Sequence, residues 1–144
     1  MIKLKLRIND KSEIIIKEYR TKKFTEDDVR VYMKIGLLKI LVAEDSWKYE
    51  IYPTLHYILN NIQEYDEELI NTNFYNMEDS GKYSEYVLFD LKHQVLIYKK
   101  TDKVYLELRR NISGKIYRFE LSSVTVNNWI RDLYKKYGEV CVGE

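Results

Sequence analysis

Near the N-terminus, hydrophobic and polar residues alternate with a regular period. From Ile2 to Ile8, apolar residues alternate with lysine or arginine, which is the period of a half-buried strand. Turn residues follow at 9–12, and Glu13 to Tyr19 is a second strand-like segment, so the sequence predicts a β-hairpin. Lysines at the outward positions are typical of an edge strand, where they discourage pairing with another chain.

The next segment has the spacing of an amphipathic helix. Thr25 is placed as an N-cap, and Asp28 supplies an acid in the first turn. Seven positions then fit one helical stripe: Val29, Tyr32, Met33, Gly36, Leu37, Ile40 and Leu41. The pattern therefore predicts a helix that continues to about Ala43. Residues 37–43 also fit a strand pairing with residues 47–52, and the sequence leaves that alternative open.

A short strand and a second helix are predicted around the single proline. Trp47, Tyr49 and Ile51 alternate with charged residues, which predicts a strand ending at Pro53. Thr54 is placed as the cap of a helix. Its apolar face is Leu55, Ile58, Leu59, Ile62, Tyr65 and Leu69. Residues 71–82 are rich in asparagine and lack periodicity, so they are interpreted as the longest loop.

The C-terminal half predicts a four-strand antiparallel meander, with strands near 84–91, 93–99, 104–110 and 115–121. A four-residue loop at 111–114 would fix the register of its last hairpin. Leu108 then faces Tyr117 and Leu106 faces Phe119 on an apolar face, whereas Glu107 faces Arg118 on a charged outer face.

A capped helix follows the meander. Ser123 or Thr125 is placed as its N-cap. The apolar stripe comprises Val126, Trp129, Ile130, Leu133, Tyr134 and Tyr137. An antiparallel meander sheet with two or three amphipathic helices predicts an α+β two-layer sandwich. We expect residues 1–144 to form one domain, with an N-terminal hairpin and two helices before the meander and the C-terminal helix.

Composition restricts the class of protein more than its function. The chain has 45% hydrophobic and 33% charged residues and a net charge of +1, as expected of a soluble globular domain. Cys141 is the only cysteine, so no internal disulfide can form and a cytoplasmic location is expected. No stretch has the length or hydrophobicity of a membrane span. The many tyrosines fit either a core or a homodimer face, which leaves the oligomeric state open.

Sequence motifs for catalysis, metals and cofactors are absent. The only histidines are His56, interpreted as lying at the rim of the core, and His93, interpreted as exposed at a turn. The asparagine-rich segment 71–79 carries oxygen ligands but lacks the glycine and glutamate that a calcium loop needs. The glycines are scattered, which argues against a phosphate loop. The sequence therefore predicts a protein that is not an enzyme and has no cofactor or metal ion.

An acidic segment is the sequence feature that best fits a protein partner. Residues 61–80 contain six acids and no lysine or arginine: Glu64, Asp66, Glu67, Glu68, Glu78 and Asp79. Such a segment can contact a basic surface and accelerate association. In size, layout and lack of catalytic motifs the chain resembles bacterial immunity proteins, and the resemblance implies a small inhibitor that binds a cognate toxin. No residue role is carried over from it.

The sequence is also compatible with two other functions. The meander is rich in bases and tyrosines, so Lys99, Lys100, Arg109 and Arg110 form an alternative surface for nucleic acid. An enzyme whose site is assembled from distant residues, for example around His56, is the third hypothesis.

Overall fold

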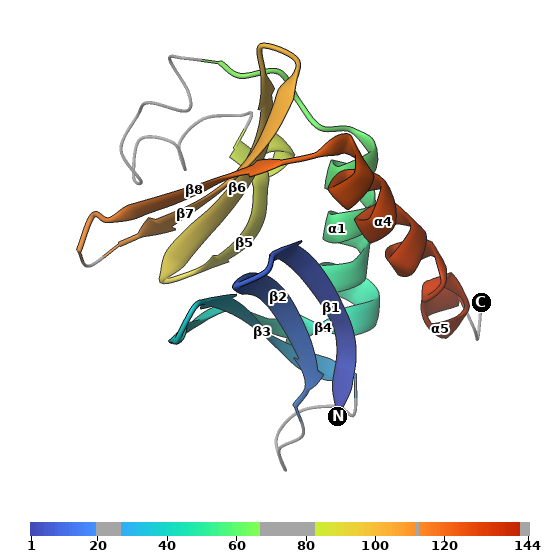
Figure 1. The fold of residues 1–144 in the computed structure, drawn as a ribbon. Helices are drawn as coiled ribbons and strands as arrows, with labels where there is room; N and C mark the ends of the chain where they lie inside the picture. The colour runs from blue at the N-terminus through green and yellow to red at the C-terminus, as the bar shows by residue number, and fades with distance from the viewer. Residues whose placement is uncertain (20–26, 67–82, 112, 142–144) are drawn as a thin grey trace.

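The computed structural model describes residues 1–19, 27–66, 83–111 and 113–141, and it shows an α+β fold. The first sheet, sheet A, contains β1 (Ile2–Asn9), β2 (Ser12–Glu18), β3 (Asp28–Ile35) and β4 (Leu38–Ser46). The second, sheet B, contains β5 (Val87–Leu91), β6 (His93–Lys100), β7 (Lys103–Arg110) and β8 (Ile116–Leu121). Both are antiparallel meanders in chain order (Figure 1).

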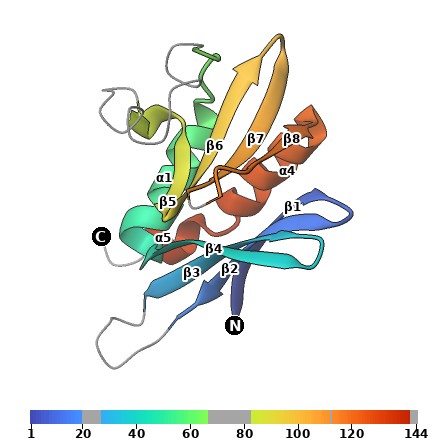
Figure 2. The ribbon, with the colours of Figure 1, turned by 90° about the vertical axis from the view of Figure 1, so that its left-hand side faces the viewer.

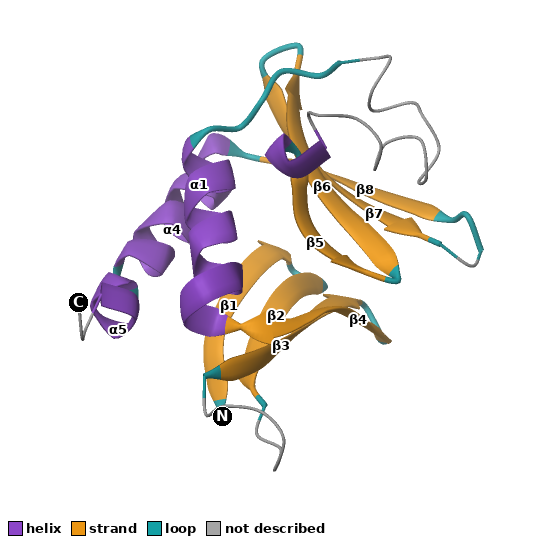
Figure 3. Cartoon of the chain, turned by 180° about the vertical axis from the view of Figure 1, so that it is seen from behind, coloured by secondary structure: helices purple, strands orange, loops and turns teal. Residues whose placement is uncertain are grey.

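Helices connect and cover the two sheets. A π-helix, η1 (Trp47–Ile51), leads directly into α1 (Tyr52–Asn60), and a short 3-10 helix, η2 (Tyr83–Glu85), precedes β5. After β8 come α4 (Ser123–Tyr134) and the short α5 (Tyr137–Cys141). The helices α1, α4 and α5 lie together on one side of the molecule (Figure 3). In the described parts of the chain, no helix combines the length and hydrophobicity needed to cross a lipid bilayer.

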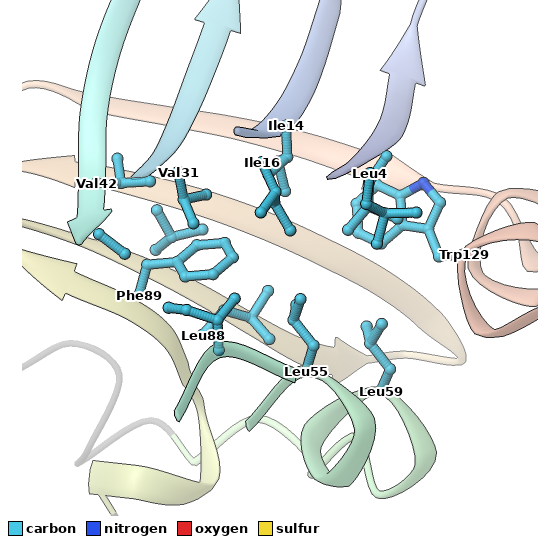
Figure 4. Packing of buried hydrophobic residues seen from close by; sticks show 14 of the residues in the cluster. Leu4, Ile14, Ile16, Val31, Val42, Leu55, Leu59, Leu88, Phe89 and Trp129 are labelled. Atoms are coloured by element: carbon cyan, nitrogen blue, oxygen red, sulfur yellow. The ribbon is translucent and has the colours of Figure 1, made fainter. Parts of the chain in front are cut away.

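One hydrophobic core is shared by both sheets and the helices. Leu4, Ile14, Ile16, Val31 and Val42 enter it from sheet A. They meet Leu88 and Phe89 of β5, Leu55 and Leu59 of α1, and Trp129 of α4 (Figure 4). The strands of the two sheets run in different directions over this core (Figure 2). Since burial of apolar surface is the main favourable term in folding, this shared core holds the two sheets together.

The predicted helix over residues 25–43 is wrong: the described part of that segment, from residue 27, contains the β3–β4 hairpin. Every second residue of this part of β3 points into the core: Val29, Val31 and Met33. Residues 29–33 fit this alternating pattern of a strand as well as they fit a helical one. The two strands meet at Gly36, whose φ of 59° is readily adopted only by glycine. The proposed cap Thr25 lies outside the described residues. The alternative strand at 37–43 is confirmed, but its partner is β3 and not residues 47–52.

The strand predicted at residues 47–51 is also wrong, because these residues form η1. Its first turn is held by side chains that accept backbone hydrogen bonds. Ser46 Oγ accepts from Tyr49 N at 3.1 Å, and Asp27 Oδ2 accepts from Lys48 N at 3.0 Å. Such capping satisfies amide groups that the start of a helix leaves unpaired, so this segment is stable as a helix.

The second and third predicted helices are present with different boundaries. The helix around Pro53 begins at Tyr52, so Thr54 is not its cap, and it ends at Asn60 instead of continuing to Leu69. The last helix is capped by Ser122, whose side chain accepts from Thr125 N, and not by Ser123 or Thr125. Tyr134 and Tyr137 are exposed and stack on each other outside the core.

The predicted meander and the register of its last hairpin are confirmed, but its first strand begins at Val87 and not near residue 84, because Tyr83–Glu85 form η2. Leu106 pairs with Phe119, Leu108 with Tyr117, and Glu107 with Arg118. The predicted charged outer face differs in one respect, because Glu107 is completely buried. A second hydrophobic cluster of Tyr86, Val87, Leu96 and Tyr98, with Tyr65 and Tyr105 packed against it, covers that face of sheet B. The expected arrangement of one sheet is thus replaced by two sheets, and the first half of the chain supplies a sheet in place of a hairpin and a long helix.

Candidate functional site

The face of sheet A that points away from the core is strongly basic. Cross-strand pairing places eight charged residues on it, and we call this surface the basic face. The basic residues are Lys5, Arg7, Lys17, Arg30, Lys34 and Lys39, and the acidic residues are Glu13 and Glu44. A row of less polar residues crosses three strands, where Ile15 of β2 pairs with Tyr32 of β3 and Tyr32 pairs with Leu41 of β4. On β1 the row ends at a cation, because Ile15 pairs with Lys5. The face is therefore an apolar strip flanked by cations.

Two lysines lie over the ring of Tyr32, and a third lies beside them on β3. The Nζ atoms of Lys39 and Lys17 lie 4.4 Å and 5.8 Å from the ring centroid, and Lys34 pairs with Lys39 across the β3–β4 hairpin. Contact with the Lys17 amine and its charge, followed by burial and by the charge of Lys34, lowers the pKa of Lys39. Among the described residues, no carboxylate contributes to that shift. Crowded like charges oppose folding, so this cluster is better suited to binding an anion than to stabilising the sheet.

Arg30 differs from these lysines, because its guanidinium group already contacts a carboxylate and an aromatic ring of the protein. Its Nε lies 3.0 Å from Glu44 Oε2, and its guanidinium carbon lies 3.5 Å from the centroid of the Tyr19 ring. A bidentate or stacked arginine of this kind orders its neighbours. The cations that remain for a ligand are therefore mainly the lysines.

A groove continues from the basic face at the β1 edge of sheet A. It has a volume of about 350 Å³ and lies between β1 and α4, and we call it the β1–α4 groove. Lys5 and Arg7 belong both to the basic face and to this groove, and Asn128, Arg131 and Asp132 line it from α4. Trp129 forms its buried inner wall and donates its indole N–H to the carbonyl of Arg7 at 2.7 Å. That hydrogen bond fixes the distance between the two walls.

The acidic segment predicted from the sequence lies largely outside the described residues: only Glu64 and Asp66 are placed. Neither is on a helix, because α1 ends at Asn60. Glu64 is exposed and forms a parallel β-bridge with Lys99, and its carbonyl accepts a hydrogen bond from the Tyr86 hydroxyl at 3.0 Å. Glu67, Glu68, Glu78 and Asp79 are not described.

The structure does not bring the predicted basic residues of the meander together. Lys99 and Lys100 lie at one end of the β6–β7 hairpin, and Arg109 and Arg110 lie at the other. Lys100 Nζ lies 4.3 Å from the centroid of the Tyr65 ring, and Arg109 is paired with the buried Glu107. Lys100 and Arg109 are therefore already in contact with other residues of the protein.

The two histidines have the opposite exposure to the one expected. His56 is exposed and stacks on Tyr52, with ring centroids 5.9 Å apart. His93 is buried, and its Nδ1 accepts a hydrogen bond from Asn111 N at 3.2 Å. Burial, with the charges of Arg110 and Lys92, lowers the pKa of His93. His93 is thus held as a neutral acceptor that stabilises the end of the β6–β7 hairpin.

A second groove, of about 290 Å³, lies between β4 and β5 where the two sheets meet. Its rim carries Glu44, Asp45, Glu50 and Asp90, and Leu88 and Phe89 form its apolar floor. We call it the acidic groove. Among the described residues, no group of three or more histidine, cysteine, aspartate or glutamate side chains is arranged to hold a metal ion.

Sequence reasoning missed the basic face because residues 29–43 were interpreted as a helix, which separates Lys34 and Lys39 from the strands. Part of the signal was present, since Lys5, Arg7 and Lys17 occupy outward positions of the first hairpin, although Glu13 and Ile15 share that face. Comparison of the chain with protein-family models, curated proteins and solved structures finds no match. The geometry of these surfaces is therefore the basis for inferring a function.

Proposed function

We propose that this protein binds nucleic acid, without catalysing a reaction, through the basic face of sheet A. The observation that supports this most directly is the lysine cluster at Tyr32, in which Lys17 and Lys39 lie over the same ring and Lys34 pairs with Lys39. A chain of phosphates neutralises such a cluster, and the released counterions make the association favourable.

A lysine-rich face fits a nucleic acid better than an acidic protein. Lysine is depleted at the centre of protein–protein interfaces, whereas lysine and arginine dominate contacts to phosphate. The face spans four strands, so the distance across it is about 14 Å at the usual spacing between strands. Tyr32 is half-buried at its centre and offers an aromatic surface beside the cations.

The test is binding of a fluorescently labelled oligonucleotide at several salt concentrations. Reversal of the cluster with Lys17→Glu, Lys34→Glu and Lys39→Glu should weaken binding by about tenfold or more. It should also reduce the slope of log affinity against log salt by about two to three. The matched control, called the sheet B variant, reverses three exposed lysines in or next to the strands of sheet B: Lys92, Lys100 and Lys115. It should change affinity much less.

Undetectable binding, or an equal loss in the two triple variants, would overturn the proposal. A loss confined to the sheet B variant would move the binding surface to the meander and would likewise contradict it. Circular dichroism spectra of both variants establish that the fold is retained.

The acidic groove favours a second function, in which the protein binds a basic protein partner as an inhibitor. Its apolar floor and its acidic rim, in which Glu44 is already paired with Arg30, are suited to an arginine or lysine side chain with its aliphatic stem. This keeps the class of partner expected for an immunity-type module but places the contact away from residues 64–79. Reversing Asp45 and Glu50 to lysine should slow association with a captured partner at low salt, and an unchanged association rate would exclude this function.

A further inference from the structure

The β1–α4 groove is lined by both basic and acidic residues, whereas a site for phosphate would need only the basic ones. Three cations line it, Lys5, Arg7 and Arg131, together with the acids Asp10 and Asp132. The acids are only loosely paired: Arg7 Nη2 lies 4.0 Å from Asp10 Oδ1, and Arg131 Nε lies 3.7 Å from Asp132 Oδ1. A groove that offers both donors and acceptors suits the polar edge of a nucleobase, which also presents both.

Asn128 is the residue of this groove best able to recognise a base. It lies on α4, it is half-buried, and its carboxamide carries a donor and an acceptor on one planar group. Such an amide can form two parallel hydrogen bonds to a base edge. The volume of about 350 Å³ is within the range of sites that hold small ligands, whereas a double helix is too wide to enter.

We propose that the β1–α4 groove receives an unpaired base of a single-stranded nucleic acid whose phosphates lie on the basic face. Lys5 and Arg7, which belong to both surfaces, connect them, so a strand crossing the face from β4 to β1 arrives at the mouth of the groove. This inference rests on the proposed function and adds a substrate class to it: single strands are preferred over duplexes.

The experiment compares the affinity of one oligonucleotide as a single strand and as a duplex, with the wild-type protein and with two leucine variants. Asn128→Leu removes the polar amide from the groove. Asn127→Leu, the matched control, changes an exposed neighbour that does not line the groove. We expect the wild type to prefer the single strand. Asn128→Leu should weaken single-strand binding about fivefold or more and leave duplex binding unchanged, and Asn127→Leu should change neither.

Equal affinity for the two forms, or an Asn128→Leu variant that binds like the wild type, would overturn the inference. The proposed function would still stand in that case, provided that the triple reversal on the basic face weakens binding by about tenfold or more. If that reversal has no effect, the proposed function itself fails. Should Asn128→Leu not fold, Arg131→Gln tests the same wall of the groove, and the same loss of single-strand preference is expected.

Discussion

Trp129 and Arg7 lie 122 positions apart in the chain and are joined by a hydrogen bond, in which the indole N–H donates to the Arg7 carbonyl at 2.7 Å. The bond ties α4 to β1, the edge strand of sheet A, and the indole is almost completely buried beside it. A single residue therefore contributes to the core and also sets the width of the β1–α4 groove.

Replacing Trp129 with phenylalanine should lower the free energy of unfolding more than the same change at Trp47. Both tryptophans are buried, but Trp47 Nε1 has no hydrogen-bond partner within the described parts of the chain. Trp129→Phe leaves the Arg7 carbonyl without its donor, which costs about 1 kcal/mol beyond the packing loss common to both variants. Urea unfolding of the two variants measures the difference. An equal loss would mean that the hydrogen bond contributes nothing to stability.

The buried carboxylate of Glu107 organises the outer face of sheet B. Arg118 Nε donates to it at 2.9 Å, the Tyr98 hydroxyl donates at 3.1 Å, and Arg109 also pairs with it. Glu107→Ala leaves these donors unmatched and should destabilise the fold by about 3 kcal/mol or more.

The control for that change is Glu120→Ala, which removes an exposed ion pair with Lys103 on the same face of β8 as Arg118. Exposed pairs contribute little, so a loss of about 0.5 kcal/mol or less is expected. Chemical denaturation distinguishes the two residues, and comparable losses would show that Glu107 is not an essential centre of the network.

Tyr98 should make the protein sensitive to alkaline pH. Burial, reinforced by the charge of Glu107, raises the pKa of Tyr98 to about 12. The folded state then retains the phenolic proton where the unfolded state has lost it, so stability is complete below about pH 10 and falls as the pH rises towards 12. This residue alone can contribute a slope of up to about 1.4 kcal/mol per pH unit. Tyr98→Phe should show a shallower fall in urea-unfolding free energy over this range, and parallel curves would contradict the assignment.

Lys39→Gln should increase stability while weakening nucleic-acid binding. A pKa lowered by neighbouring lysines means that the folded state binds this proton less tightly than the unfolded state. Stability of the wild type therefore rises as the pH approaches the ordinary lysine value from below, and at neutral pH the charge opposes folding. The gain in Lys39→Gln should appear at low salt, about 20 mM, and diminish at high salt, because the lysines are accessible to screening ions.

Lys11→Gln, at the exposed β1–β2 turn, serves as the control and should leave both properties nearly unchanged. The two measurements are thermal unfolding and oligonucleotide anisotropy on the same samples. A Lys39→Gln variant that is less stable than the wild type would show that the lysine stems pack favourably enough to outweigh the repulsion.

Gly36→Ala should destabilise the β3–β4 hairpin by about 1 kcal/mol. The φ of 59° is unfavourable for any residue with a side chain, whereas an added Cβ would meet no atom within 4 Å, so the cost is confined to the backbone. Gly138→Ala, within α5 and also free of steric contact, is the control and should be neutral or slightly stabilising. Equal effects in thermal unfolding would contradict this account of the turn.

The elements that could be predicted from sequence are those whose pattern of apolar and polar residues is compatible with a single secondary structure and register. The register of the β7–β8 hairpin is one example. A shift by one residue would bring Leu106 and Leu108 to the outer face, so the apolar residues and the loop at 111–114 allow only the observed pairing. The amphipathic stripe from Val126 to Leu133 is another, because its period fits a helix and no strand.

The pattern of residues 29–43 is compatible with two structures, a helix and a hairpin, and tertiary contacts determine which of them forms. Their apolar residues fit a helical stripe and also an alternating hairpin, and the hairpin is favoured because β2 offers a long edge on which β3 can pair. Gly36 was the residue that distinguished the two, since a glycine in the middle of an amphipathic pattern is more consistent with a tight turn than with a continuous helix.

The amino-acid sequence by itself determined the α+β class, the C-terminal meander and its final helix, because these depend on contacts between neighbouring segments. Only the tertiary structure decided which charges share a surface. Lys5 and Lys39 lie on opposite edge strands of sheet A, and their common face exists only after four strands have paired. Likewise Glu107 is buried and His56 exposed because of what packs over them, which no local pattern specifies.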